Sequence, residues 1–336
     1  TNANTHFLSR SDRVKSVDLH PTEPWLLTAL HTGSIEIWNT RTHALVKTLQ
    51  VSATPVRAAR FVVSENKNWV VTGADDATVR VFDAHTSALV TSFKAHDDYV
   101  RCIDVHPSKP FVLTCSDDKS IKMWDWEREW ACVQVFEGHD HYVMQAKFNP
   151  ADPNLIASAS LDRSVRVWSL TSGGGVSIAT LTGHTSGVTC VDFFNSEAVT
   201  EGTAGAGTGA VAPATYILSG SDDVTVKVWD LATKSAVHTL VGHTKNLTAV
   251  LKHPHLPLIV SASEDDTVRT WSAATFHAES VLNFDLCRAW CLRALPDSSA
   301  ITIGYDHGSV IVDLAPVDGG QVTGVVTRAG AARPAR

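Results

Sequence analysis

A motif that returns about every 42 residues is the feature of this sequence that most limits its fold. Six segments end an apolar, alternating stretch at an aromatic anchor, at Trp38, Phe82, Trp124, Trp168, Trp229 and Trp271, and a degenerate seventh, HGSVIVDLAPV, follows around Val312. The steps between the six anchors are 44, 42, 44, 61 and 42 residues. Each repeat reads as short strands separated by turns rich in Pro, Asn, Asp, Ser and Gly. This spacing is typical of four-stranded blades, so we predict an all-β, seven-bladed β-propeller.

The two ends of the predicted propeller are expected to meet. The seventh repeat lacks an outer strand, and HFLSR (residues 6–10) is available to supply it, which would close the ring in one shared sheet. We expect the propeller to span residues 1–317, with residues 318–336 as a tail or the start of a linker. The long step contains EAVTEGTAGAGTGAVAPA, which has no periodicity, so a flexible insertion at about 195–213 is predicted between the first two strands of blade 5.

Composition argues against several classes of function. The 336 residues carry a formal charge of −7, so nucleic acid is not expected as the main partner. No uncharged apolar run of about 18 residues and no signal-peptide pattern is present, so neither membrane insertion nor export is expected. The six cysteines lack C-x-x-C spacing and are expected to be reduced core thiols. No phosphate-binding loop or zinc spacing is present, so no cofactor or metal is expected.

Four repeats contain a Ser, His and Asp set that would suggest nucleophilic catalysis if it occurred once. The sets, each with its anchor, are His96, Ser116, Asp118 and Trp124; His139, Ser160, Asp162 and Trp168; His184, Ser221, Asp223 and Trp229; and His243, Ser263, Asp265 and Trp271. An active site needs one constellation, whereas a buried polar relay that staples each blade needs one per repeat. We therefore expect these residues to be structural and the protein not to be an enzyme.

Charged residues in equivalent turns mark a candidate binding site. Seven residues before the anchors, in the predicted turns between the second and third strands, lie His31, Asp75, Asp117, Leu161, Asp222, Glu264 and Asp306. Any one of these acids has a structural alternative, because aspartate is a good turn former. A second set flanks the start of the innermost strands: Arg13, Lys15, Arg57, Tyr99, Arg101, Tyr142, Arg288 and Trp290. A cationic sector beside an anionic one suits a short ligand that has both a carboxylate and ammonium groups.

The repeats resemble the WD-repeat family over residues 5–317, and several longer stretches resemble one branch of it. RSDRVKSVDLHPTEPW (10–25), TPVRAARF (54–61), DYVRCIDVHP (98–107) and RAWC (288–291) are similar to the N-terminal propeller of the coatomer beta-prime family. The resemblance implies a coat protein, cytoplasmic and peripheral on Golgi and transport-vesicle membranes, for Golgi-to-ER transport. Its expected partners are cytosolic cargo tails ending in K-x-K-x-x or K-K-x-x, and other coatomer subunits bound through a further C-terminal region.

The same resemblance suggests roles for individual residues. Arg13, Lys15 and Arg57 are expected to bind the carboxylate of the cargo tail, and Asp98, Asp117 and Asp222 are expected to bind its lysines. Second-rank candidates are His31, Asp75, Tyr142, Arg288 and Trp290, of which Asp75 comes from the turn set. The alternative is a generic propeller for protein assembly or ubiquitin binding, which would use the same face without needing a free carboxylate.

Overall fold

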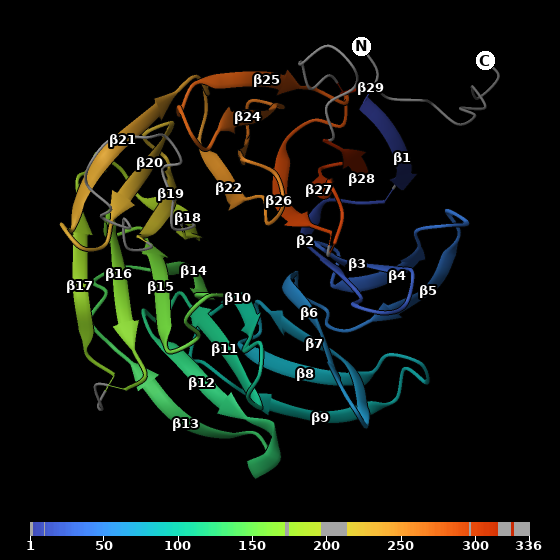
Figure 1. Ribbon diagram of the computed structural model, residues 1–336. Coiled ribbons are helices and arrows are strands. Elements are labelled where there is room, and N and C mark those ends of the chain that lie inside the picture. Colours follow the sequence, from blue (N-terminus) through green and yellow to red (C-terminus); the bar gives the residue numbers. More distant parts are fainter. Residues whose placement is uncertain are drawn as a thin grey trace, which may run out of the picture.

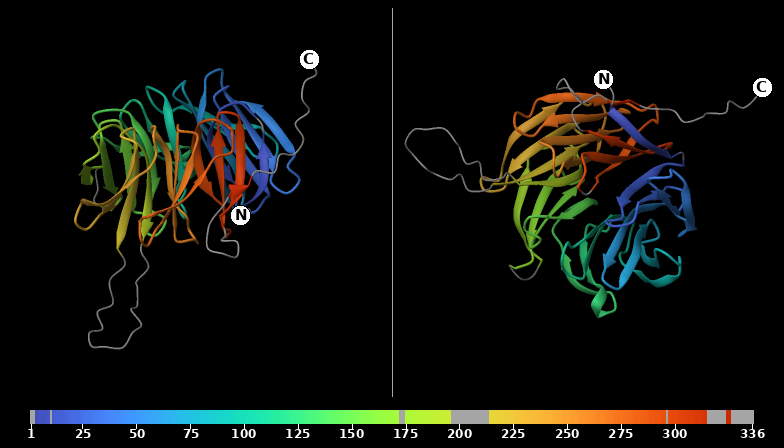
Figure 2. Two further views of the ribbon diagram at one scale, coloured as in Figure 1. Left: turned by 90° about the horizontal axis from the view of Figure 1, so that it is seen from above. Right: turned by 45° about the vertical axis from the view of Figure 1, so that its right-hand side comes forward.

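The computed structural model describes residues 3–9, 11–171, 175–195, 214–295, 297–314 and 324–325. Its strands form seven sheets around a central axis, seen along the axis in Figure 1 and from the side in Figure 2. Six sheets have four strands and the seventh has five. The predicted seven-bladed propeller is therefore confirmed. Within the described residues, the only helical segment is the short 3-10 helix η1 (Trp126–Arg128), and no helix is long and apolar enough to cross a membrane.

Within a blade, the strands follow chain order from the axis outward. The innermost strands are β2 (Val14–Leu19), β6 (Val56–Ser64), β10 (Val100–Val105), β14 (Val143–Phe148), β18 (Val188–Asn195), β22 (Leu247–Lys252) and β26 (Ala289–Ala294). The second strands are β3 (Trp25–Leu30), β7 (Lys67–Ala74), β11 (Phe111–Ser116), β15 (Leu155–Ser160), β19 (Thr215–Ser221), β23 (Leu258–Ser263) and β27 (Ala300–Tyr305). The third strands are β4 (Ser34–Asn39), β8 (Thr78–Asp83), β12 (Ile121–Asp125), β16 (Ser164–Ser169), β20 (Thr225–Asp230), β24 (Val268–Ser272) and β28 (Gly308–Asp313). The outer strands of blades 1 to 6 are β5 (Leu45–Gln50), β9 (Leu89–Lys94), β13 (Ala131–Phe136), β17 (Ser177–Thr182), β21 (Ser235–Val241) and β25 (Ala278–Leu282).

The ring closes through the N-terminal strand, as the sequence predicts. β1 (Ala3–Ser9) is the fourth strand of blade 7 and pairs antiparallel with β28, with Thr5 opposite Val312 and Ser9 opposite Ser309. A two-residue strand, β29 (Gly324–Val325), pairs in parallel with β1. The predicted insertion of blade 5 lies, beyond Asn195, outside the described residues, and so does the predicted tail apart from β29.

The hydrophobic core lies between neighbouring blades. One cluster combines Leu27 and Ile37 of blade 1 with Phe61, Val70 and Phe82 of blade 2. Successive side chains of a strand point to opposite faces, and in a propeller both faces of a blade meet another blade, so second strands such as β11, β23 and β27 are buried at nearly every position. A blade therefore has no complete core of its own, and each one stabilises the next.

Where an innermost strand of one blade passes close to the second strand of the blade before it, only a small residue fits. At Gly73, a Cβ atom would lie 2.5 Å from Cγ1 of Val100 in the next blade. At Gly304, a Cβ atom would lie 2.5 Å from Sγ of Cys291 in the same blade and 2.7 Å from Cγ1 of Val14, across the junction at which the ring closes. The approach of the next blade therefore explains Gly73, and it restricts Gly304 together with Cys291.

Four blades contain the same buried hydrogen-bond network. In blade 4, His139 Nδ1 lies 2.7 Å from a carboxylate oxygen of Asp162, and His139 Nε2 lies 2.7 Å from Ser158 Oγ. Ser158 Oγ also accepts a hydrogen bond of 2.9 Å from the indole of Trp168. Equivalent contacts surround His96, His184 and His243. Each histidine is thus held inside its own blade and linked to its anchor tryptophan.

The predicted serine of this network is wrong in all four blades. The hydroxyl that contacts both His and Trp lies two residues earlier, at Thr114, Ser158, Ser219 and Ser261 instead of Ser116, Ser160, Ser221 and Ser263. Residues two apart in a strand face the same side, so their spacing does not distinguish them. Ser160 instead donates to the carbonyl oxygen of His141 and accepts the N–H of Asp162, which holds the turn that follows β15.

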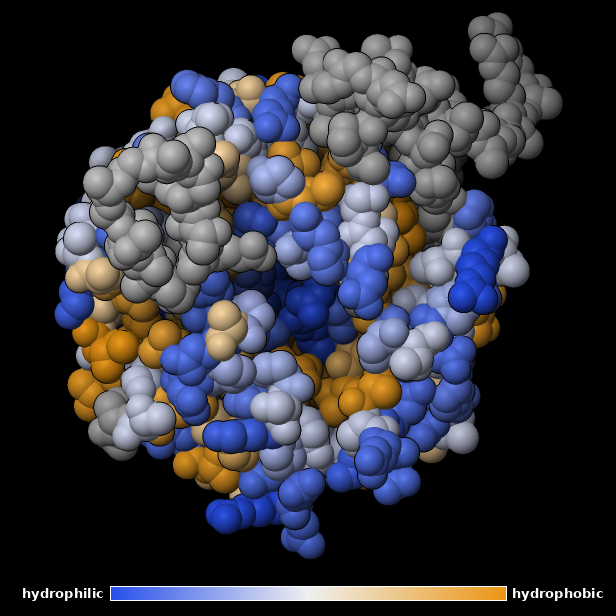
Figure 3. Space-filling view, in the orientation of Figure 1, coloured by the Kyte–Doolittle hydropathy of each residue, from blue (hydrophilic) through white to orange (hydrophobic). Residues whose placement is uncertain are grey.

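A belt of charged residues lines the axis, where Figure 3 shows a hollow with hydrophilic residues at its floor. The belt is formed by the fifth residue of six innermost strands: Asp18, Arg60, Asp104, Lys147, Asp192 and Arg293. Ion pairs join neighbours along it: Arg293 with Asp18 at 3.2 Å, Asp18 with Arg60 at 3.2 Å, Arg60 with Asp104, and Lys147 with Asp192 at 3.2 Å. The same three aspartates also accept main-chain N–H groups of the following blade, from Phe61, Phe148 and Lys252. The ion pairs and main-chain hydrogen bonds of the belt therefore connect each blade to the next, from blade 7 to blade 1 and onward to blade 6.

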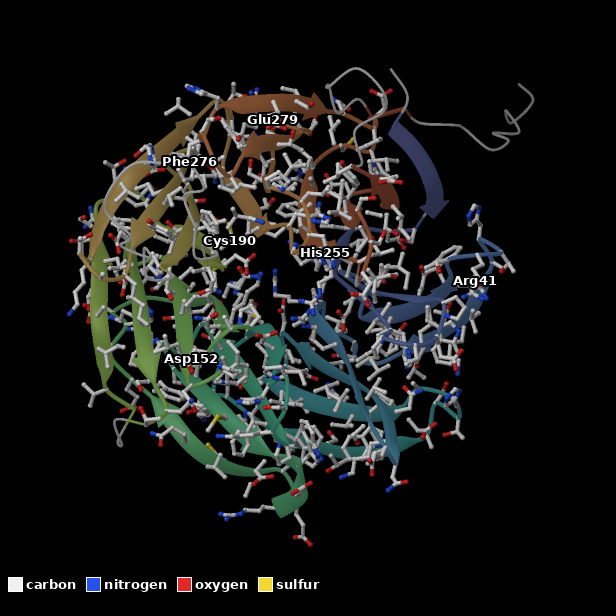
Figure 4. The ribbon with its side chains drawn as sticks, in the orientation of Figure 1. Arg41, Asp152, Cys190, His255, Phe276 and Glu279 are labelled. Atoms are coloured by element: carbon white, nitrogen blue, oxygen red, sulfur yellow. The ribbon has the colours of Figure 1, made fainter. Side chains whose placement is uncertain are left out.

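The cysteines only partly match their predicted place in the core. Cys115 and Cys190 are buried and Cys102 and Cys291 are half-buried, but Cys132 and Cys287 are exposed. All six are free thiols. Figure 4 labels Cys190 close to the axis, and Arg41 and Glu279 at the circumference.

Loss of the hydroxyl shared by His139 and Trp168 should destabilise the propeller. We expect Ser158→Ala to lower the free energy of unfolding by roughly 2 kcal/mol, because it leaves two buried polar groups without a partner. Urea denaturation followed by tryptophan fluorescence measures the change. Thr182→Ala, on the exposed side of β17, is the control and should change stability by less than about 0.5 kcal/mol. A larger loss from Ser160→Ala than from Ser158→Ala would contradict the assignment of this network.

Candidate functional site

The turns between the second and third strands of all seven blades lie on one rim of the propeller. In every blade the turn residue donates its main-chain N–H to the carbonyl oxygen of the residue just before the innermost strand, at 2.9–3.2 Å. The seven pairs are His31 with Arg13, Asp75 with Pro55, Asp117 with Tyr99, Leu161 with Tyr142, Asp222 with Gly187, Glu264 with Asn246, and Asp306 with Arg288. One repeated hydrogen bond therefore brings both predicted residue sets to the same rim.

Two arginines of the rim are clamped by an aspartate of their own blade. Arg57 donates to both carboxylate oxygens of Asp75, at 2.5 and 2.9 Å. Arg101 binds Asp117 in the same bidentate way, at 2.6 Å for each bond. In each case the arginine is the second residue of the innermost strand, and the aspartate lies in the turn that follows the paired strand. The two guanidinium groups are thereby held in a fixed orientation.

Asp306 binds rim side chains of both blade 1 and blade 7. One of its carboxylate oxygens accepts from Arg13 Nε and from the Trp290 indole, both at 2.8 Å, and the other accepts from Arg288 Nε at 2.9 Å. Burial opposes ionisation of this carboxyl group, but the hydrogen bonds from Arg288, Trp290 and Arg13 dominate and lower the pKa of Asp306 to about 2. Asp306 is therefore ionised at neutral pH and positions three side chains of the rim.

Aromatic rings hold the cationic groups side by side. The ammonium group of Lys15 lies 3.6 Å from the centre of the Trp290 ring, with the guanidinium groups of Arg288 and Arg13 at 4.9 and 5.5 Å from it. Tyr99 lies between the guanidinium groups of Arg57 and Arg101, at 5.5 and 5.6 Å. Arg101 also lies 5.9 Å from the Tyr142 ring. Arg13, Lys15, Arg57, Arg101 and Arg288 together form what we call the cationic sector.

Lys15 is the member of the cationic sector without an acidic partner. Among the described residues, no carboxylate lies within ion-pair distance of its ammonium group. Burial lowers the pKa of Lys15 to about 8, aided by Arg57, Arg13 and Arg101 and opposed by Cys291. Burial and then the charges of Arg13, Arg57 and Lys15 also lower the pKa of His31, so this exposed imidazole is neutral at pH 7. The positive field of this sector is therefore not fully balanced within the protein.

Three further acids of the rim form no bidentate pair with an arginine. Asp222 makes no side-chain hydrogen bond or ion pair with the described residues, and burial, followed by the charges of Glu264 and Asp223, raises its pKa. Glu264 lies 3.7 Å from Arg288. Asp98 is half-buried, and its carboxylate accepts the N–H of Tyr99, next to the turn of blade 3. We call Asp222 and Glu264 the acidic pair.

Three members of the cationic sector and the acidic pair border one cavity at the axis, with a volume of about 360 Å³. Lys15, Arg57 and Arg101 line one side, and Asp222 and Glu264 line the other. Deeper in the channel, the cavity is lined by the basic members of the axial belt, Arg60, Lys147 and Arg293. The described residues include no group of three His, Cys, Asp or Glu side chains that could hold a metal ion. Because the cavity is lined by both basic and acidic side chains, it can attract charged groups of either sign.

The structure thus brings all the predicted site residues to one rim, but it divides the acids into two kinds. Asp75 and Asp117 are already neutralised by arginines, whereas Asp222 is not. The axial belt was not predicted as part of the site. Its signal is present in the sequence, as a charged residue at the fifth position of six innermost strands.

Comparison with known proteins supports the repeats recognised in the sequence. A family model described as "WD domain, G-beta repeat" matches residues 3–39, 44–83, 87–125, 130–169, 175–230 and 234–272. Coatomer subunit beta' of Rattus norvegicus is 51% identical over 304 residues, which cover 90% of this chain and 32% of the rat protein. The human subunit is 51% identical over 306 residues (91% and 32%), and coatomer subunit beta'-1 of Arabidopsis thaliana is 50% identical over 308 residues (92% and 31%).

The chain spans about a third of the length of the curated relatives it matches. The family model matches six repeats, each of which runs from the outer strand of one blade to the third strand of the next and ends one residue after the anchor from which the repeat was recognised. The chain therefore belongs to the WD-repeat, or G-beta repeat, family and is similar to coatomer beta' subunits from animals and a plant.

Proposed function

We propose that this propeller is a cargo-recognition domain of a vesicle coat, which binds C-terminal dilysine signals of the K-x-K-x-x or K-K-x-x kind on cytosolic tails of membrane proteins. The observation that supports it most is the uncompensated Lys15 in the cationic sector, which faces the uncompensated Asp222 across one cavity. A peptide end with a carboxylate and nearby ammonium groups has the complementary charges. The similarity to coatomer beta' subunits supports the context.

The terminal carboxylate is proposed to bind at Lys15. The Lys15 ammonium lies on Trp290 between the ordered guanidinium groups of Arg13 and Arg57, so a carboxylate there gains one unpaired cation and the field of two others. Asp75 and Asp306 act as positioning residues, since they fix those guanidinium groups before the ligand arrives. A charge-assisted hydrogen bond of this kind contributes about 1.5–3 kcal/mol.

The lysines of the tail are proposed to bind the acids of the rim. Both dilysine patterns have a lysine third from the end, which in an extended peptide lies about 7 Å from the terminal residue. Asp222, with Glu264 beside it, offers an unpaired carboxylate. Asp98, whose carboxylate accepts the N–H of Tyr99 but has no ion-pair partner among the described residues, offers a second acid near the turn of blade 3. Asp117 keeps lone pairs beyond its two bonds to Arg101, so it would share a lysine rather than bind it alone.

By similarity, the propeller is proposed to work in the cytoplasm, on Golgi and transport-vesicle membranes, and together with other coatomer subunits. Those contacts are proposed to involve regions beyond the third of the relatives' length that this chain spans.

Blocking the peptide carboxylate should weaken binding. We expect a K-x-K-x-x peptide with a C-terminal amide to bind at least tenfold more weakly than the free acid, equivalent to about 1.4 kcal/mol. Isothermal titration calorimetry on the paired peptides measures this difference. The affinity of the free acid should also fall with added salt. Equal affinity of the two peptides would show that the terminal carboxylate is not recognised, and would favour a generic platform for protein assembly.

Binding should weaken as the pH rises through the pKa of Lys15. Only the protonated amine attracts a carboxylate, and with a pKa of about 8 its charge is lost between pH 7 and 9. We expect an affinity about tenfold lower at pH 9 than at pH 7. In Lys15→Met, affinity at pH 7 should be lower and should change little with pH. The same pH dependence in both proteins would assign the titration to another group.

The acidic pair should be coupled to a lysine of the tail. Asp222→Asn is expected to weaken the dilysine peptide roughly fivefold, and alanine at one of the two peptide lysines should remove this sensitivity in a double-mutant cycle. Asp140→Asn, at an exposed acid of the loop before β14, is the matched control and should leave affinity unchanged. No coupling with either lysine would exclude Asp222 from the lysine site.

A further inference from the structure

Lys15 combines three features that occur together nowhere else in the cationic sector. The arginines around it each bond to a carboxylate, Arg13 to Asp306, Arg57 to Asp75 and Arg101 to Asp117, whereas Lys15 has no such bond with the described residues. One side of its ammonium group lies on the Trp290 ring. The side chain also lines the cavity, so the amine can be reached from the mouth of the propeller.

The surroundings of Lys15 favour the uncharged amine. Three strand starts contribute charges around it: Arg57 from β6, Arg101 from β10 and Arg13 from the residue before β2. The thiol of Cys291 on β26 acts in the opposite direction, and burial is the largest effect. With a pKa of about 8, about a quarter of the Lys15 amines are neutral at pH 7.5, against about one in a thousand for a lysine of ordinary pKa 10.5. A neutral amine is a nucleophile, and an ammonium group is not.

We propose that Lys15 is an N-acylation site for anionic acyl thioesters of the coenzyme A class, and that its acylation switches off carboxylate binding at this rim. The acylation is inferred from the environment of the amine, and its effect on carboxylate binding rests on the proposed function. In the reaction, the Lys15 nitrogen attacks the thioester carbonyl. A C–N bond forms, the C–S bond breaks, and the amine proton leaves with the thiolate as a free thiol.

The site suits both the reagent and the product. The phosphate groups of coenzyme A are attracted by the guanidinium groups of Arg13 and Arg57 at the mouth. A cavity of about 360 Å³ leaves room for an acetyl group beside the amine. The product amide is neutral, so it relieves the repulsion from the arginines. It also removes the one cation that lacks an internal partner, and with it the strongest attraction for a ligand carboxylate.

Relative acetylation rates test the site. The intact chain is incubated with acetyl-coenzyme A at pH 7.5, and acetylation of each lysine is followed by quantitative peptide mass spectrometry. Lys245, exposed in the loop before β22 on the same rim, is the reference. We expect Lys15 to react at least ten times faster, and its rate to level off above about pH 8 while that of Lys245 keeps rising. An equal or slower rate at Lys15 would overturn the proposal.

A charge variant separates the effect of the surroundings from simple exposure. Arg57→Gln removes a neighbouring cation and frees the Asp75 carboxylate, so it should raise the pKa of Lys15 and slow its acetylation at pH 7.5 severalfold. Arg128→Gln, at an exposed arginine of η1, is the control and should leave the rate unchanged. The same rate in all three proteins would mean that the arginines do not activate this amine, contrary to the proposal.

Peptide binding tests the switch separately. The acetylated protein and Lys15→Gln should bind the free-acid K-x-K-x-x peptide at least tenfold more weakly than the unmodified protein. Full binding after acetylation would overturn the switch while leaving the rate measurements intact. If the unmodified protein does not bind the peptide, the proposed function fails and the switch with it. The reactivity of Lys15 is then still decided by the acetylation rates, which are measured without peptide.

Discussion

Each blade of this protein can bury its faces only against its two neighbours, and this constraint governs the rest of the structure. The hydrophobic clusters lie between blades, and the cluster that Val14, Val17, Leu26 and Leu30 of blade 1 form with Ala300 and Ile311 of blade 7 is complete only when the ring closes. Closure also assembles the rim. Arg13 and Asp306, which share a hydrogen bond, are separated by 293 residues in sequence and become neighbours only where blade 1 meets blade 7.

Buried charge follows the same logic along the axis. A carboxylate in the channel is costly unless it is paired, and Asp18, Asp104 and Asp192 each satisfy one oxygen with a basic side chain and the other with a main-chain N–H of the following blade. Both carboxylate oxygens of each aspartate therefore already have a partner inside the protein. The basic side chains of the belt face the cavity, which extends the positive character of the rim into the channel.

Much of the architecture was predictable, because anchor spacing and strand alternation are local patterns that repeat. The equivalent turn positions of the rim were predictable for the same reason. Which acids are free was not predicted, although a rule is visible afterwards: Asp75 and Asp117 pair with an arginine at the second position of their own innermost strand, and blade 5 has Thr189 there instead. The shared hydroxyl of the histidine networks could not be chosen from spacing, since two hydroxyl groups lie on one strand face.

The strand pairing that closes the ring has a mechanical consequence. The start of β1 lies beside the end of β28, with Thr5 opposite Val312, so tension applied outward at these two points would load the hydrogen bonds one pair at a time, from one end of the ladder. Peeling of this kind needs less force than sliding two strands past each other, because only a few bonds resist at any moment. A pull on this sheet would therefore separate β1 from β28 and open the propeller at blade 7, while the other six blades kept their shape.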